Sequence, residues 1–181
     1  VCSSDLEIMV FGSRAGVSAA RYVRNQDRPS FEDDQAAAEA SRIQGLLERG
    51  ALEMTAAQGK DRMRQVMQTH VGVLRRVGGL ETARHTLEEM EKDLLPRVGV
   101  TGTGLHQNYS LLAYLELENM VKVARMIAAA AGARKESRGA HYVEEYPDLD
   151  TSSPPLCTVT RLEEGAPRIT TRPVEATEIR P

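Results

Sequence analysis

The residues of this chain best suited to chemistry lie in one short segment of its C-terminal third. Arg138, His141 and Tyr142 fall within five residues of sequence, and Glu144 and Glu145 follow directly. Arginine carries a permanently charged fork of donors, histidine exchanges protons near neutral pH, and tyrosine both donates and accepts hydrogen bonds. Such groups can clamp an acidic surface or relay a proton, depending on which neighbours the fold brings to them.

Two interpretations of Arg138 stay open at this stage. It can clamp the helical part of the protein to another domain, or it can be a helix-end cation paired with Glu144 or Glu145. Removal of a buried, paired arginine would cost about 3–5 kcal/mol, and removal of an exposed one less than about 1 kcal/mol. For His141 we expect a hydrogen-bonded loop histidine rather than a proton relay.

Other candidate sites are weaker. His70, His85 and His106 have no metal-ligand spacing among them, so we predict no metal site. The loop Gly102–Gly104 is rich in glycine, but no strand is expected before it and no Lys-Ser/Thr pair follows, so we expect an ordinary interhelix loop. We assign no catalytic residue to this chain.

Two further features have structural interpretations. Glu116 and Glu118 could suggest a pair of catalytic carboxylates, but residues two apart diverge on a helix, and we expect a solvated face. Cys157 is expected to be an inert thiol.

Hydrophobic periodicity and turn residues predict five helical stretches and one hairpin. The helices are expected at residues 6–25, 34–49, 60–70, 80–95 and 109–135. Gly78 and Gly79 are interpreted as a turn, and Pro96 ends the fourth helix. Residues 157–163 and 167–174 alternate loosely around Glu163-Glu164-Gly165 and predict a β-hairpin.

The predicted fold is therefore mainly α: a three- or four-helix bundle with a short β-hairpin tail, preceded by one extra helix. The extra helix carries a face of small residues at helical spacing: Gly12, Ala15, Gly16, Ala19 and Ala20. Each glycine in a helix interior costs about 1 kcal/mol relative to alanine, so we expect this face to pack closely on a partner.

Composition excludes several classes of protein. The 181 residues carry a net charge of −3, and the cations are scattered among carboxylates, which gives no case for nucleic-acid binding. No apolar run reaches the ~18 residues of a membrane span. The two cysteines are far apart in sequence, which suggests a reducing, intracellular setting.

Four stretches, in order, carry a resemblance to a known family. They are residues 6–16, 67–75, 115–147 and 168–174. They resemble the C-terminal region of the flavoprotein subunit of succinate dehydrogenase and fumarate reductase, a family that includes L-aspartate oxidase. The most specific stretch contains the run Glu-Ser-Arg-Gly-Ala-His-Tyr at 136–142.

The resemblance implies a domain organisation. Residues 1–28 would be the C-terminal helix of a truncated FAD-binding α/β domain, residues 29–136 the helical C-terminal domain, and residues 137–181 the motif loop and β tail. It also makes Ser4 the cofactor-binding candidate, since free N–H groups at a helix N-terminus favour negative charge on a flavin. Arg138, His141 and Tyr142 would be motif or interdomain residues.

Residues 1–6 raise a separate hypothesis. They correspond to codons whose DNA resembles a sequencing adapter, so we hypothesise that they, Ser4 included, are not native.

The implied activity is interconversion of succinate and fumarate by hydride transfer with flavin, in a subunit whose other FAD- and substrate-binding residues precede this chain. The implied partners are a dicarboxylate substrate and an iron–sulfur subunit of a membrane-bound complex. The implied location is cytoplasmic, or peripheral at the cytoplasmic face of the inner membrane. By itself the chain is expected to be inactive. Alternatives are the C-terminal region of an L-aspartate oxidase and a stand-alone helical interaction module.

Overall fold

The structure is a computed structural model that describes residues 3–28, 30, 33–152 and 154–174, with the side chains of residues 3–6 left out. Its helices are α1 (Ser3–Arg24), α2 (Asp33–Glu48), α3 (Ala56–His70), α4 (Val77–Glu89), the π-helical turn η1 (Met90–Leu94), the 3₁₀ turn η2 (Leu95–Arg97) and α5 (Tyr109–Ala133). Its strands are β1 (Leu74–Arg75), β2 (Tyr142–Val143), β3 (Leu156–Glu163) and β4 (Ala166–Pro173).

The chain divides into two compact units, one ending at Ser41 and the other beginning at Arg42. In the first unit, the described side chains of α1 from Glu7 to Arg24 are all exposed. Among the described residues, no atom apart from the chain neighbours and the nearby backbone of α1 lies within 4 Å of the position that a Cβ would take on Gly12 or Gly16. Close packing of this small-residue face on a partner stays a prediction.

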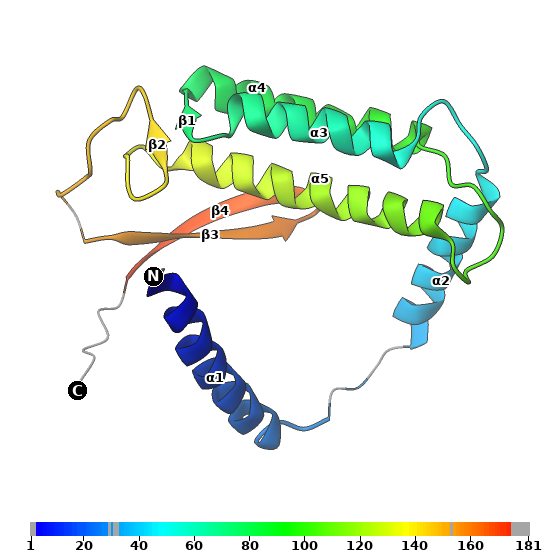
Figure 1. Ribbon diagram of the computed structural model, residues 1–181, viewed down its shortest axis with the longest axis horizontal. Helices are drawn as coiled ribbons and strands as arrows, with labels where there is room; N and C mark the ends of the chain where they lie inside the picture. The colour runs from blue at the N-terminus through cyan, green and yellow to red at the C-terminus, as the bar shows by residue number, and fades with distance from the viewer. Residues whose placement is uncertain (1–2, 29, 31–32, 153, 175–181) are drawn as a thin grey trace. The chain divides into compact units, whose positions relative to one another are not determined.

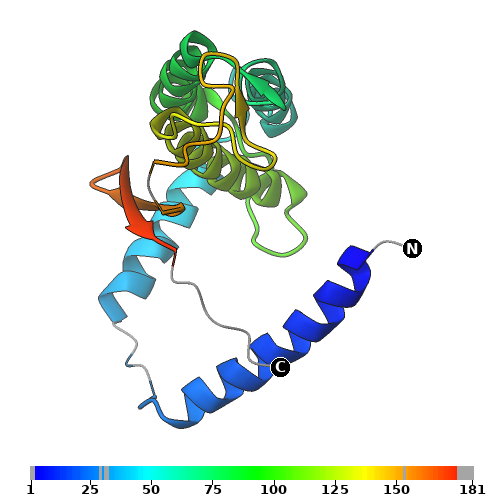
Figure 2. The same cartoon turned by 90° about the vertical axis from the view of Figure 1, so that its left-hand side faces the viewer.

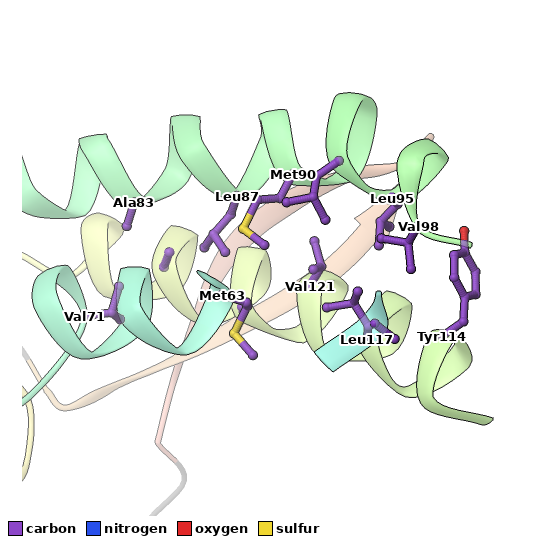
Figure 3. Close-up of a cluster of buried hydrophobic side chains, with 14 of the residues drawn as sticks. Met63, Val71, Ala83, Leu87, Met90, Leu95, Val98, Tyr114, Leu117 and Val121 are labelled. Atoms are coloured by element: carbon purple, nitrogen blue, oxygen red, sulfur yellow. The ribbon is translucent and has the colours of Figure 1, made fainter. Parts of the chain in front are cut away.

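The second unit is a bundle of α3, α4 and α5, in which α3 and α4 lie along one side of the long helix α5 (Figure 1). Figure 3 shows the core between them, where Leu87, Leu117 and Val121 converge with no exposed surface. Buried residues recur on α5 at helical spacing, so they form one apolar face along the helix. That face packs against both α3 and α4. A mainly helical fold with a bundle at its centre is thus confirmed.

The C-terminal end of α2 belongs to the same core. Leu46 and Leu47 are buried, and Arg42 donates to the carboxylate of Glu118 at 3.1 Å. Lys60 of α3 pairs with Glu116. The two glutamates diverge on α5 as expected. Glu116 is exposed, as on a solvated face, whereas Glu118 is half-buried, and each glutamate pairs with a cation from another helix.

Local signals set the beginnings of two helices. Thr55 and Gln58 form a capping box at α3, since the Gln58 amide donates to the Thr55 hydroxyl and the Thr55 amide donates to the Gln58 side chain. Asn108 caps α5 by accepting a hydrogen bond from the Leu111 amide at 2.9 Å. The same asparagine donates to the carbonyl of Gly104, which orders the glycine loop as the ordinary interhelix connection that we expected.

The beginning and end of α4 differ from expectation. Gly78 and Gly79 lie inside its first turn, so the prediction of a turn there was wrong. At the other end the predicted continuous helix becomes η1 and then η2, with Pro96 in the 3₁₀ turn. Pro96 lacks the N–H that an α-helix interior needs, so the helical stretch does not continue as α-helix beyond η2.

The predicted hairpin is confirmed. Strands β3 and β4 are antiparallel, with Glu163 opposite Ala166, and Glu164 and Gly165 between them have φ of 50° and 77°. Positive φ at both central residues is the geometry of a type I′ turn, which matches the twist of the strands. Figures 1 and 2 both show the hairpin alongside α5, with which both strands are in contact.

Arg125 secures the hairpin to the bundle. This residue of α5 is 8% exposed, pairs with Glu91 of η1, and donates to the carbonyl of Gly165 at 2.9 Å. Its single guanidinium thus connects three elements that are distant in sequence.

We therefore expect Arg125→Met to lower the free energy of unfolding by about 2 kcal/mol, because the methionine fills the volume but leaves Glu91 and the turn carbonyl without their donor. Chemical denaturation followed by circular dichroism measures this change. Arg168→Met is the control, since Arg168 forms an exposed pair with Glu163 whose loss should cost less than about 1 kcal/mol. Equal effects of the two variants would contradict the assignment.

Candidate functional site

The segment 134–150, here called the motif loop, follows α5 directly. Arg134 has extended dihedral angles and ends the helix. The loop then turns tightly, since the backbone groups of Arg138 and His141 exchange two hydrogen bonds of 2.8 and 3.0 Å. Gly139 inside this turn has φ of 59°, a conformation that side chains with a Cβ rarely adopt.

Glu136 is the centre of the motif loop. It is 8% exposed and accepts hydrogen bonds from Arg134 at 2.6 Å, from Arg138 at 3.0 Å, and from the Asp150 amide at 3.1 Å. The hydrogen bond from Arg138 is the main cause that holds the pKa of the Glu136 carboxyl below its usual value of 4.5. The expected pairing of Arg138 with Glu144 or Glu145 was therefore wrong.

The physical reason is the early end of α5. Because α5 ends at Ala133, Glu136 and Arg138 lie beyond the helix, and a bend at Glu136 lets the two side chains meet. The sequence interpretation treated Arg138 as a helix-end residue and missed both Arg134 and Glu136. The alternation Arg-x-Glu-x-Arg is the signal that could have revealed the two ion pairs.

Glu144 and Glu145 dock the motif loop on the junction between α3 and α4. Glu144 pairs with Arg76 at 2.8 Å, and both carboxylate oxygens of Glu145 lie 3.1 Å from the amide nitrogen of Val77. Glu145 thereby caps the N-terminus of α4 from 68 residues further along the chain, where a negative charge is favourable. This distant cap explains how α4 begins with Val77 in spite of the glycines that follow.

A short parallel pairing strengthens the same junction. Leu74 and Arg75 of β1 lie opposite Tyr142 and Val143 of β2, and the Glu144 amide donates to the carbonyl of Arg75 at 2.9 Å. Tyr142 is 37% exposed at this surface, whereas Val143 is 1% exposed. Sequence reasoning missed this pairing, because two-residue strands carry no periodic pattern.

His141 is held between the two halves of this junction. Its Nδ1 lies 2.9 Å from a guanidinium nitrogen of Arg75, and its Nε2 lies 3.3 Å from the carbonyl oxygen of Arg134. Arginine can only donate and a carbonyl can only accept, so Nδ1 is the acceptor and Nε2 carries the proton. The expectation of a hydrogen-bonded loop histidine is confirmed.

The charge state of His141 follows from its surroundings. Burial lowers the pKa of the imidazole from its ordinary value of 6.5, and the positive charges of Arg75 and Arg134 act in the same direction. The ring is therefore neutral when the motif loop is docked at neutral pH.

The motif loop also holds the tail. Arg134 donates to the carbonyl of Leu156 at 2.8 Å and to the hydroxyl of Thr158 at 3.0 Å, both in β3.

Ser137 forms hydrogen bonds within the motif loop itself. It donates to the carbonyl of Tyr146 at 2.7 Å and accepts from the Val143 amide at 3.0 Å. Ser137 was missed by the sequence interpretation, although serine is a common side-chain partner of turn backbone.

Substitution of Glu136 tests this network. We expect Glu136→Gln to lower Tm by several degrees at pH 7, because the two arginines lose their shared anion. The folded-state pKa is depressed, so the stabilisation is complete above the unfolded value of 4.5 and is lost as pH falls through the folded value. The Tm difference between variant and unsubstituted chain should therefore shrink below pH 4.5 in a calorimetric series.

Glu89→Gln is the control, since Glu89 is exposed and lies beside His85 on the outer side of α4. A Tm difference for Glu136→Gln that stays constant down to pH 3 would contradict the ionic role of the carboxylate.

The remaining candidates fall outside this cluster. Ser4 lies in the first turn of α1, and its side chain is outside the described part of the chain. Cys157 is a half-buried free thiol in β3. Among the residues that the structure describes, no group of three or more His, Cys, Asp or Glu side chains could hold a metal ion.

The geometry of the motif loop is that of a positioning site. Four arginines and three glutamates join the end of α5, the α3–α4 junction and the hairpin; they are Arg75, Arg76, Arg134, Arg138, Glu136, Glu144 and Glu145. Most of these arginines form hydrogen bonds or ion pairs with carboxylates or carbonyls. Such a cluster fixes the relative placement of helices, which is what a supporting domain of a larger enzyme requires.

Comparison with known proteins gives concordant results. The family model described as fumarate reductase flavoprotein C-term matches residues 60–181. The fumarate reductase flavoprotein of Haemophilus influenzae is 33% identical over 178 residues, which cover 97% of this chain and 29% of that protein. The L-aspartate oxidase of Acinetobacter baylyi is 34% identical over 99 residues, which cover 54% of this chain and 17% of that protein.

A solved structure extends the similarity to the fold itself. A mutant of the E. coli quinol fumarate reductase superposes with a TM-score of 0.83 and 28% identity, over 97% of this chain and 30% of that chain. The fold and the motif loop thus define the C-terminal region of an FAD-dependent oxidoreductase. The chain belongs to the succinate dehydrogenase and fumarate reductase flavoprotein family. It spans 29% of the length of the Haemophilus influenzae protein that it matches.

The glycine loop before α5 does not have the geometry of a dinucleotide-binding loop. A dinucleotide cradle needs a glycine-rich turn between a strand and a helix, and the glycine loop before α5 follows the 3₁₀ turn η2 with no intervening strand. Asn108 fills the space beside Gly102, where its side-chain nitrogen lies 3.3 Å from the position of a Cβ. No chemical step through flavin is therefore assigned to this chain's residues.

Proposed function

We propose that this chain is the C-terminal part of a flavoprotein subunit that interconverts succinate and fumarate by hydride transfer with FAD. The observation that carries the proposal is the match of the fumarate reductase C-terminal family model to residues 60–181, the bundle and motif loop included. In this proposal FAD is bound mainly by a preceding region, with the start of α1 and Ser4 at its edge. The chain by itself binds FAD weakly and turns over no substrate.

The proposed domain roles follow from the same similarity. Residues 1–28 supply the last helix of the FAD-binding domain, residues 29–136 the helical domain, and residues 137–181 the motif loop and tail. Arg138, His141 and Tyr142 serve as interdomain residues in this proposal. The exposed ring of Tyr142 supports a contact outside the bundle.

The proposed partners are a dicarboxylate substrate and an iron–sulfur subunit of a membrane complex. Support comes from the similarity to a quinol fumarate reductase. The same similarity supports the proposed location, which is the cytoplasmic side of a membrane that other subunits span. Within the described residues, no helix combines the length and apolar character that crossing a bilayer requires.

A second candidate is the C-terminal region of an L-aspartate oxidase. The 34% identity to the Acinetobacter baylyi enzyme over 99 residues favours it specifically. The two candidates share a fold and a flavin but differ in the bond that is oxidised, C–C in succinate and C–N in aspartate.

The decisive experiment is to read the source DNA upstream of residue 1 and through the codons for residues 1–6, and then to purify the product of the whole reading frame. Bound FAD with oxidation of succinate or reduction of fumarate supports the first candidate. Peroxide release from L-aspartate supports the second. An upstream region that begins with a start codon, encodes no dinucleotide-binding segment and yields a product without FAD would overturn both, in favour of a stand-alone helical module.

A further inference from the structure

The docking of the motif loop depends on one uncharged ring. His141 accepts a hydrogen bond from Arg75 through Nδ1 at 2.9 Å, and its backbone forms the tight turn with Arg138. Arg75 is fixed in turn by a hydrogen bond from its Nε to the carbonyl of Val71 at 3.2 Å. The contact between His141 and Arg75 therefore joins the motif loop directly to the end of α3.

Protonation of the His141 ring would turn its attraction to Arg75 into repulsion. Nε2 already carries a proton, so a second proton can bind only to Nδ1. An imidazolium N–H would then face the guanidinium N–H of Arg75. One hydrogen bond would be lost, and two positive charges would lie 2.9 Å apart where one neutral group now faces one cation.

The other charged groups around the ring do not offset that repulsion. Arg134, at the end of α5, adds a second positive charge, and its carbonyl already uses the Nε2 proton at 3.3 Å. Glu136 is a nearby anion, but it is shared between Arg134 and Arg138. On the α4 side, Glu144 is engaged by Arg76.

We propose that His141 and Arg75 form a proton-operated latch, which holds the motif loop on the α3–α4 junction when His141 is neutral and releases it when His141 is protonated. The β1–β2 pairing and the Glu144 amide bond to the Arg75 carbonyl open with the latch, while the hydrophobic core of the bundle stays closed. The latch is independent of flavin chemistry, and its failure would leave the proposed function untouched.

The linkage between proton binding and opening of the motif loop determines the direction and size of the pH response. The pKa of His141 is lowered in the docked state and returns toward 6.5 in the open state, so acid favours opening. Between pH 7.5 and pH 5.5 the opening equilibrium should rise by up to about tenfold, since a group with a pKa near 6.5 gains its proton over that interval.

Hydrogen exchange of single amides in the 181-residue chain measures this opening. The Glu144 amide, bonded to the Arg75 carbonyl, reports the latch, and an amide in the middle of α5 reports global unfolding. After correction for the intrinsic exchange rate at each pH, opening at Glu144 should increase by up to about tenfold at pH 5.5 while α5 stays protected.

The key variant is His141→Asn, in which the amide oxygen can accept from Arg75 but does not titrate between pH 7.5 and pH 5.5. Its Glu144 opening should be independent of pH over this interval. His85→Asn is the matched control, because His85 is an exposed histidine beside Glu89, and it should keep the response of the unsubstituted chain.

Two outcomes would overturn the latch. One is an equal pH response at Glu144 in His141→Asn and the unsubstituted chain. The other is a rise at Glu144 that the α5 amide follows in parallel, which indicates global unfolding. If the asparagine variant does not fold, an NMR titration of the His141 ring in the unsubstituted chain decides: a pKa at or above 6.5 excludes the latch.

Discussion

Replacing Leu117 by alanine is expected to lower the free energy of unfolding by about 3–5 kcal/mol, the largest stability effect that we predict for this chain. Leu117 has no exposed surface and lies where α3, α5 and η1 meet. A Cβ on Gly59 of α3 would lie 2.5 Å from Leu117 Cδ2 and 3.4 Å from Leu94 Cδ2, which shows how closely the helices approach there. Truncation would leave a cavity that stiff, packed neighbours cannot fill.

Urea denaturation of the 181-residue chain, followed by circular dichroism, measures this loss. Leu112→Ala on the same helix is the matched control, since Leu112 is 52% exposed and its truncation should cost less than about 1 kcal/mol. If the two variants lose the same stability, the core is not centred on α5 as described.

Gly99→Ala is expected to cost about 3 kcal/mol for the opposite reason, because it adds volume where none is free. The added methyl would lie 2.4 Å from the Leu52 nitrogen and 2.7 Å from the Gly50 oxygen, both backbone atoms that no rotamer change can move. The segments on either side are joined by hydrogen bonds from Gly99 to Met54 at 3.0 Å and from Val100 to Gly50 at 2.9 Å. The alanine must push these segments apart.

The same denaturation series tests this prediction. Gly104→Ala is the control, since Gly104 is in the loop that follows and no atom lies within 4 Å of its Cβ position. If the loss of stability for Gly99→Ala is no larger than that for Gly104→Ala, the segment 50–54 can move aside at little cost. The contact would then contribute little to holding this α2–α3 connection on the bundle.

The motif loop has a physical role that does not depend on catalysis. Its ion pairs connect α5, the α3–α4 junction and the hairpin, so it fixes the geometry of one end of the domain. The proposed latch would make this support sensitive to pH between 7.5 and 5.5.

Much of the fold could be predicted from sequence, because its signals are local. The periodic apolar stripe of α5, the Glu164-Gly165 turn and Pro96 each act within a few residues. The predicted bounds of the helices and the hairpin lie within a few residues of those observed, except that α4 ends at Glu89 and gives way to η1 and η2. The Glu-Ser-Arg-Gly-Ala-His run indicated the family.

The candidate site was predicted only in part. Sequence reasoning placed Arg138 at the end of the last helix and His141 in the loop that follows. It was not enough to identify the partners of these residues. Whether Arg138 meets Glu136 or Glu144 depends on where α5 ends, and the cap that Glu145 places on Val77 spans 68 residues. These contacts were settled by the packing of the helices, since ion pairs and caps between distant segments form after packing has brought their backbones together.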